Sequence, residues 1–325
     1  MRNLKTEEEI IASWDDYPSK PTVSICCITY NHKPYIEDAL KGFLRQETPF
    51  PFEILIHDDA SNDGTLEIIL EYKKKYPRII HTVVQKENKY SQGTRFMGPN
   101  FLYPLAKGEY IALCEGDDYW TSPNKLKIQH DFMAGNPEYS FCFHEVEQID
   151  NTENFSSYSA YRTVPNSTVE ARDVILNHFT PTLSMFFRRE LIPLNLSAYK
   201  KKITSGDIFL AILLVSKGKG FCFEEKMGVH RHHDGGVTKM DATYIDKRLT
   251  VKNYKDLYKE LYKLVENKNK RNIRKISALR CEYVLFRLYR TEKKYFRAFL
   301  ILIPLTIKYP FWAINIMKAK TNGYI

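Results

Sequence analysis

The chain has 325 residues, of which 43% are hydrophobic, which is enough for one large or two smaller packed domains and excludes a disordered chain. Its formal net charge is +9, but the last 75 residues hold 18 Lys and Arg against 5 Asp and Glu, so residues 1–250 are slightly acidic. The basic character therefore belongs to the tail, which argues against a nucleic-acid partner for the whole protein.

The amino terminus and the cysteines both indicate an intracellular protein. The first residues carry charges with no apolar core segment behind them, so we expect no secretory signal and a cytoplasmic location. The six cysteines form no CxxC pair, and most lie in apolar runs such as residues 25–28 and 141–143. We expect buried, reduced thiols rather than a zinc site or disulfide bonds.

The first 115 residues alternate between predicted strands and helices. After a polar arm at residues 1–20, the elements are strands at 23–30, 52–57, 79–84 and 109–114, with helices at 36–46 and 66–77. A crossover helix is expected at 96–106, but Pro99 and Pro104 should make it short or kinked. This alternation predicts an α/β fold with a mostly parallel central sheet flanked by helices.

The second part of the chain continues with mixed elements. We expect helices at 124–133, around 174–175, at 206–215 and from about 244 onward, and strands at 139–146, 183–187 and 221–229. Residues 150–168 have no clear period and are a candidate for a mobile loop over a pocket.

The end of the chain is basic and contains an apolar segment at residues 299–307 that is too short to span a bilayer. A basic helical tail that ends in such a segment suits the cytoplasmic face of an anionic membrane, which predicts peripheral membrane contact. The alternative, a helical hairpin that packs on its neighbours, is equally compatible with the sequence.

Three carboxylates follow the predicted strand at 109–114. Ligands of open α/β sheets bind beyond the carboxyl ends of the strands, which is where Glu115, Asp117 and Asp118 fall. Three acids within four residues repel one another unless a divalent cation lies between them and a phosphate group. The alternative is a solvated acidic turn before the helix at 124–133.

The order of three motifs resembles family 2 glycosyltransferases. The motifs are Ser24-Ile-Cys-Cys-Ile-Thr-Tyr-Asn31, Glu53-Ile-Leu-Ile-His-Asp-Asp-Ala-Ser-Asn-Asp-Gly-Thr65 and Ala106-Lys-Gly-Glu-Tyr-Ile-Ala-Leu-Cys-Glu-Gly-Asp-Asp-Tyr-Trp120. The resemblance implies a GT-A (Rossmann-like) domain at 21–240, with a nucleotide-sugar half at about 21–122 and an acceptor half at about 123–240. A basic helical C-terminal region at 241–325 would follow.

The resemblance also implies roles for single residues. Asp207 matches the catalytic base, and Glu115 stands where the family usually has an aspartate that contacts the ribose. The implied cofactor is Mn²⁺ or Mg²⁺. The candidate nucleotide-binding residues are Thr29, Tyr30, Asn31, Asp59, Arg95, Glu115 and Asp117, and the candidate metal ligands are Asp117, Asp118 and His233.

The implied function is an inverting, metal-dependent transfer of a sugar from a nucleotide-diphosphate donor, by preference a UDP-sugar, to a hydroxyl. The acceptor would be a glycan or a lipid-linked molecule in cell-surface polysaccharide synthesis. One alternative is a GT-A domain that binds a sugar nucleotide without turnover. Another is a sugar nucleotidyltransferase, which the absence of a glycine-rich loop after the first strand disfavours.

Overall fold

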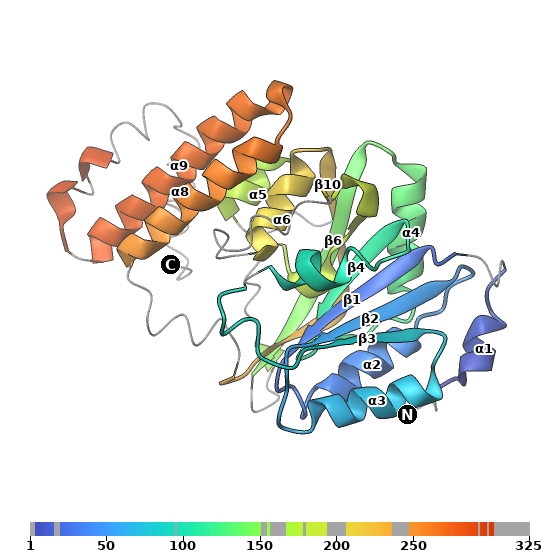
Figure 1. Ribbon diagram of the computed structural model, residues 1–325. Helices are drawn as coiled ribbons and strands as arrows, with labels where there is room; N and C mark the ends of the chain where they lie inside the picture. Colours follow the sequence, from blue (N-terminus) through green and yellow to red (C-terminus); the bar gives the residue numbers. More distant parts are fainter. Residues whose placement is uncertain are drawn as a thin grey trace.

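The computed structural model describes residues 4–15, 20–94, 96–150, 155–156, 167–177, 180–193, 206–235, 247–291, 293–297 and 299–301. Within them a twisted central sheet is covered by helices on both faces, and a helical hairpin packs beside its far end (Figure 1). The strands are β1 (Val23–Thr29), β2 (Phe52–Asp58), β3 (Ile80–Val84), β4 (Tyr110–Glu115), β5 (Tyr119–Trp120), β6 (Tyr139–Asp150), β7 (Phe155–Ser156), β8 (Ser167–Val169), β9 (Phe186–Arg188) and β10 (Lys219–His232).

The sheet has the order β3-β2-β1-β4-β9-β6-β10-β5. Strands β3, β2, β1 and β4 are adjacent in the sheet and all run parallel to one another, and β6 runs parallel to β10. The short β9 runs antiparallel between β4 and β6, and β5 runs antiparallel to β10. The mostly parallel α/β sheet predicted from the sequence is confirmed, and the parallel strands bring the ends of β1, β2 and β4 to one edge.

The helices also agree with the predicted pattern. The crossover segment that two prolines interrupt forms only a five-residue π-helical turn, at Gly98–Leu102. The principal helices are α2 (Ile36–Leu44), α3 (Thr65–Lys75), α4 (Lys125–Gly135), α5 (Ala171–Asn177), α6 (Gly206–Val215), α8 (Lys247–Leu264) and α9 (Asn267–Thr291). Most of the predicted loop at 150–168 lies outside the described residues.

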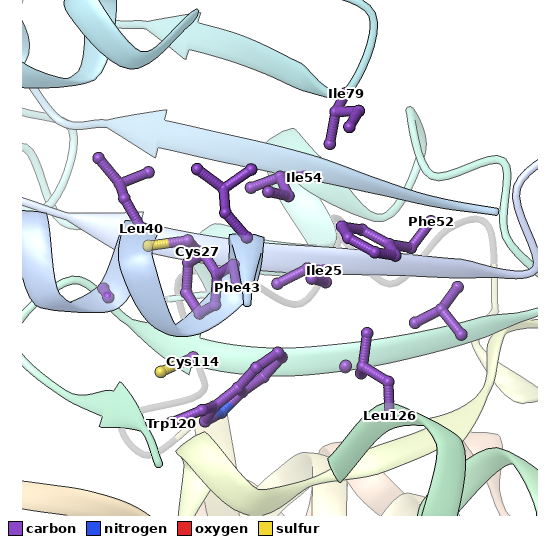
Figure 2. Packing of buried hydrophobic residues seen from close by; sticks show 14 of the residues in the cluster. Ile25, Cys27, Leu40, Phe43, Phe52, Ile54, Ile79, Cys114, Trp120 and Leu126 are labelled. Carbon is purple, nitrogen blue, oxygen red and sulfur yellow. The ribbon is translucent and has the colours of Figure 1, made fainter. Parts of the chain in front are cut away.

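Two apolar clusters form the core, one on each face of the sheet. Successive strand residues point to opposite faces, so Ile25 and Cys27 of β1 face one cluster and Cys26 faces the other. The first cluster packs against α2, α3 and α4, with Phe43 and Trp120 in edge-to-face contact at 4.9 Å (Figure 2). The second packs against α5, α6, α8 and α9. The apolar runs of the strands are explained by burial on both sides.

The amino-terminal arm contains a short helix that the sequence analysis did not identify, α1 (Glu7–Ile11). Thr6 and Glu9 form a reciprocal capping box at its start, and Ile10 and Trp14 are buried in the first core cluster. Its five residues are too few for a helical period to be recognised.

Lys125 is a fully buried lysine behind the site described below. Its Nζ donates a hydrogen bond of 2.6 Å to Gln129 Oε1 and lies 4.0 Å from the centre of the Trp120 ring. Burial lowers the pKa of Lys125 to about 7. The charged form is therefore destabilised in the folded protein.

We expect this burial to make the stability depend on pH. Between pH 7 and 9 the unfolded chain keeps the proton on Lys125 and the folded chain releases it, so the folded state gains stability as the pH rises. The free energy of unfolding of the wild type should rise relative to that of Lys125→Met by on the order of 1–3 kcal/mol over this range. Urea unfolding of both proteins at pH 7 and pH 9 measures this change. If the difference in unfolding free energy between the two proteins is the same at both pH values, the lowered pKa of Lys125 is contradicted.

Candidate active site

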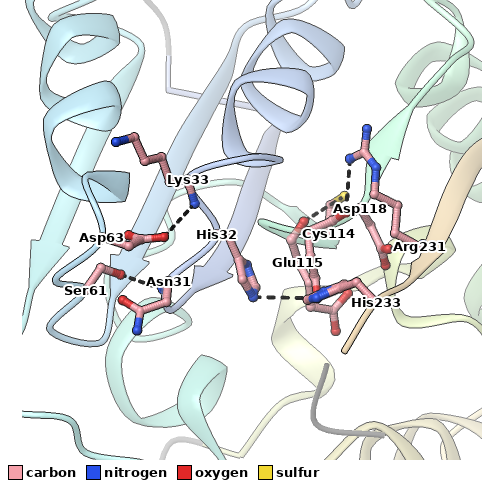
Figure 3. Close-up of polar contacts among 11 residues, drawn as sticks. Asn31, His32, Lys33, Ser61, Asp63, Cys114, Glu115, Asp118, Arg231 and His233 are labelled. Carbon is pink, nitrogen blue, oxygen red and sulfur yellow. Dashed lines mark hydrogen bonds and ion pairs between the residues drawn. The ribbon is translucent and has the colours of Figure 1, made fainter. Parts of the chain in front are cut away.

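The loops that follow β1 and β2 are joined by hydrogen bonds at the carboxyl edge of the sheet. Asn31 adopts a left-handed conformation with φ of 55°, its backbone N–H donates to Ser61 Oγ at 2.9 Å, and its Oδ1 accepts from the backbone of Asn62 at 3.0 Å. The backbone N–H of Lys33 donates to Asp63 Oδ2 at 3.0 Å (Figure 3). Two motifs far apart in sequence thus form one rigid rim.

Asp59 fixes the loop that follows β3. Its two carboxylate oxygens accept backbone N–H groups from Lys89 at 2.8 Å and from Tyr90 at 2.9 Å, and the side chain is almost wholly buried. A carboxylate offers about four acceptor positions, so these two bonds leave capacity for a ligand N–H. Tyr30, at the same rim, exposes 42% of its surface. This region could hold a flat, hydrogen-bonding ring.

The acidic turn after β4 packs directly on the end of β1. A side chain at Gly116 would place its Cβ 2.7 Å from Thr29 Oγ1 and 3.0 Å from Ile36 Cδ1, so glycine is required by the close approach. Thr29 is itself 1% exposed beneath this turn. Its side chain therefore supports the turn, and the neighbouring Glu115 and Asp117 are held at the sheet edge.

Asp117 lies between two histidines from distant parts of the chain. Its Oδ2 is 3.0 Å from His233 Nε2 and 3.6 Å from His32 Nε2, and the three side chains offer ligand atoms within 4.8 Å of one another. The ring of Tyr35 packs against His233 with centres 4.7 Å apart. Burial alone would raise the pKa of Asp117, but the hydrogen bond from His233 and the charges of both histidines lower it.

This set of atoms fits a divalent cation. Two imidazole nitrogens and one carboxylate oxygen are a combination that first-row transition metals accept, while Mg²⁺ prefers oxygen ligands. Three protein ligands leave further coordination positions for oxygens of a bound phosphate. His32, His233 and Asp117 are therefore the described residues best placed to hold a metal.

Asp118 and Arg231 join the acidic turn to the end of β10. Asp118 Oδ1 accepts the backbone N–H of Arg231 at 2.9 Å, and the Arg231 guanidinium donates to the backbone oxygen of Asp117 at 3.1 Å and pairs with Asp38. The guanidinium also stacks 4.3 Å from the centre of the Tyr119 ring. These contacts bring the histidine segment at 230–233 to the carboxylates.

Glu115 is the last residue of β4, at the start of the acidic turn. Burial raises its pKa to about 8, and the charges of Asp117 and Asp207 add to that increase. Asp207 stands in the first turn of α6 with part of its side chain accessible, and loss of hydration around its carboxyl raises its pKa above the ordinary value. An accessible carboxyl with a raised pKa can accept a proton near neutral pH.

The sequence-derived candidates are thus distributed over one edge of the sheet. Asp117 and His233 are in contact, Asp118 is part of the same turn, and the charge of Asp207 contributes to the raised pKa of Glu115. Of the three histidines at 230–233, His233 is the one in contact with Asp117, whereas His232 Nε2 is 2.9 Å from Gln148 Oε1. Arg95 lies outside the described residues.

Sequence reasoning did not place His32 in the site. It also did not predict that Arg231 contacts the backbone oxygen of Asp117 and the carboxylate of Asp38. His32 follows Asn31 at the end of the first strand, so its position beside the acidic turn could have been inferred from the parallel sheet alone. The contacts of Arg231 depend on the register of β10, which no local pattern specifies.

Comparison with known proteins gives a consistent result. A family model described as glycosyl transferase family 2 matches residues 24–193. An uncharacterized protein of Mycobacterium tuberculosis, Rv1520, is 34% identical over 229 residues, which are 70% of this chain and 62% of that protein. The putative teichuronic acid biosynthesis glycosyltransferase TuaG of Bacillus subtilis is 39% identical over 41% of this chain and 50% of its own length. The chain thus spans less than two thirds of these relatives.

Solved structures share the fold at low sequence identity. Staphylococcus aureus TarS, residues 1–349 in complex with UDP-GlcNAc, has a TM-score of 0.61 and 17% identity over 83% of this chain and 73% of that one. The mannosyltransferase PcManGT of Pyrobaculum calidifontis, in complex with GDP-Man and Mn²⁺, has a TM-score of 0.54 and 15% identity over 95% and 83% of the two chains. The GT-A architecture expected from the sequence is confirmed.

Proposed function

The chain belongs to glycosyl transferase family 2, and from this premise we propose that it transfers a sugar from a nucleotide-diphosphate sugar to an acceptor hydroxyl with inversion. The observation that carries the proposal is the grouping of Asp117, His32 and His233 at the sheet edge, with Asp207 near enough to raise the pKa of Glu115. In an inverting transfer, a cation site must lie on the diphosphate side of the anomeric carbon, and a base for the attacking hydroxyl must lie on the opposite side.

We assign the diphosphate end of the donor to the acidic turn. His32, Asp117 and His233 would hold a divalent cation, with Asp118 beside them, and Mn²⁺ suits the two imidazoles better than Mg²⁺. When bound, the cation offsets the charge that develops on the leaving diphosphate. The close packing of Gly116 on Thr29 holds Asp117 in place for this purpose.

The nucleotide base is assigned to the rim formed by Tyr30, Asn31 and Asp59. Asp59 retains acceptor capacity for a ring N–H of the kind that uracil presents, and its backbone partners in the loop after β3 position it. UDP is the preferred nucleotide, since the structural neighbour TarS is described with UDP-GlcNAc. Glu115 remains the candidate for the ribose.

Asp207 is assigned as the general base. It would take the proton of the acceptor hydroxyl while that oxygen forms a bond to the anomeric carbon and the bond from that carbon to the diphosphate breaks. The acceptor we propose is a glycan or lipid-linked intermediate of a cell-surface polysaccharide, in line with the name of the relative TuaG.

Donor binding can be tested by thermal unfolding in the presence of UDP-, GDP- and dTDP-sugars with Mn²⁺. A ligand at 100 times its dissociation constant stabilises the folded state by about 2.7 kcal/mol, so the matching donor should raise the melting temperature by several degrees. The Asp207→Asn variant is the control, because it should keep the donor-induced shift and lose transfer. No shift with any sugar nucleotide would contradict the proposal.

An assay of nucleoside diphosphate release, run beside the thermal unfolding, separates the catalytic proposal from the binding-only alternative. A chain that binds a sugar nucleotide without turnover would show the thermal shift, but the wild type would release no nucleoside diphosphate across a broad panel of acceptors. Release of the diphosphate by the wild type but not by Asp207→Asn supports catalysis.

A further inference from the structure

A basic hollow lies between α8 and α9. These two helices form the hairpin that packs beside α5 and α6 in Figure 1. Its volume is about 530 Å³. Lys270 lies in the first turn of α9, where the helix dipole adds positive potential. The hollow is lined by Lys255, Lys259, Tyr262, Asn267, Lys270, Arg271 and Arg274.

Five of the residues that line this basic hollow are cations, namely Lys255, Lys259, Lys270, Arg271 and Arg274. Among the residues that the structure describes, none of the five has a carboxylate oxygen within 4.0 Å. Two of the few acids of the hairpin are held elsewhere, Glu260 by Lys263 at 2.7 Å and Glu266 by Lys268 at 3.0 Å. Five like charges around one concavity repel one another, so a bound anion would stabilise this arrangement.

The helical residues that follow α9, at 295–297 and 299–301, expose large apolar side chains. Tyr295, Phe296, Phe299 and Leu300 have 64%, 74%, 57% and 52% of their surface exposed. At helical spacing these four positions share one side of this segment. Lys294 and Arg297 lie on the other side, and aromatic residues beside cations are typical of segments that lie in a membrane interface.

We propose that this hairpin docks on the surface of an anionic membrane, with the basic hollow binding phosphate groups of lipid headgroups. Cations alone would suit any polyanion, and aromatic rings can also stack on nucleic-acid bases. The exposed group includes the aliphatic Leu300, however, and a bilayer supplies anionic and apolar partners together. The contact would be peripheral, since no helix within the described ranges is long and apolar enough to cross a bilayer.

The proposal does not depend on sugar transfer, and the two can fail separately. Membrane docking is measured without substrate, and donor binding is measured without lipid. Residues 302–307 of the apolar segment noted in the sequence lie outside the described part of the chain, so the docking surface proposed here consists of the basic hollow and residues 293–297 and 299–301.

The test is sedimentation of the full chain with vesicles of phosphatidylglycerol and phosphatidylcholine, or of phosphatidylcholine alone. We expect binding only to the anionic vesicles and weaker binding at high salt. The variant Lys255→Gln/Lys259→Gln/Arg271→Gln should bind at least about tenfold more weakly. The control Lys252→Gln/Lys268→Gln/Lys275→Gln removes the same charge from exposed positions of the same helices and should bind like the wild type.

Three outcomes would overturn the proposal. If the wild type does not bind anionic vesicles, the membrane is not the partner of this surface. An equal loss of vesicle binding in both triple variants shows that binding depends on the overall positive charge of the hairpin and not on the basic hollow. Unchanged vesicle binding by Phe296→Ser/Phe299→Ser, together with tight binding of soluble polyphosphate, assigns the hollow to a soluble polyanion. Far-ultraviolet circular dichroism of each variant ensures that folded proteins are compared.

Discussion

We expect Asp207→Asn to lower kcat by about 100- to 10,000-fold, the range that a positioned general base contributes. Asparagine has nearly the same shape as aspartate, but it cannot take a proton from the attacking hydroxyl. The KM for the donor should stay within about threefold of the wild type, since Asp207 is assigned to the acceptor side and not to the diphosphate. Steady-state kinetics with a saturating acceptor measures both constants.

The pH profile provides a second test of the same residue. The base must be ionised, so kcat should fall as the pH falls through the pKa of Asp207. The surrounding protein raises that pKa above its ordinary value, which places the acidic limb at a higher pH than for a solvated aspartate. The residual activity of Asp207→Asn should lack this limb. A variant that keeps the wild-type rate and the same limb would show that another group accepts the proton.

The strands and motifs of the catalytic half could be predicted because their chemistry is local. Apolar runs such as that of β1 are buried on both faces, and acids after β4 must fall at the sheet edge. The predicted strand at 183–187 is less accurate, since residues 182–184 form a turn in which Ser184 Oγ donates to the Pro181 carbonyl at 2.7 Å, and β9 begins only at Phe186.

Other features depend on contacts between distant segments, which single-sequence patterns do not contain. Lys125 appears in the sequence as an ordinary helix-start lysine, and only the packing of Trp120 over it reveals a buried amine. His32 and His233 are about 200 residues apart, and they meet only because β1 and β10 both end at the acidic turn. The basic hollow likewise requires the pairing of α8 with α9.

The second large effect is expected at the proposed metal site. Asp117→Asn should reduce the affinity for Mn²⁺ strongly and lower kcat/KM by about a thousandfold or more, because a metal ion supplies several kcal/mol of charge stabilisation to the departing diphosphate. Asparagine keeps an oxygen that can accept a hydrogen bond from His233, but it removes the negative charge between the two histidines. Electron paramagnetic resonance of free Mn²⁺ measures the affinity without any turnover.

Asp38→Asn is the matched control for this substitution. Asp38 pairs with the Arg231 guanidinium beside the site but offers no atom to the His32, Asp117 and His233 group, so the Mn²⁺ affinity should change by less than about threefold. If the three side chains bind one cation as a unit, Asp117→Asn/His233→Asn should be little worse than Asp117→Asn alone, because losses at a shared ligand are not additive. Unchanged Mn²⁺ affinity in Asp117→Asn would show that other residues bind the cation, and it would contradict the assignment of the donor diphosphate to the acidic turn.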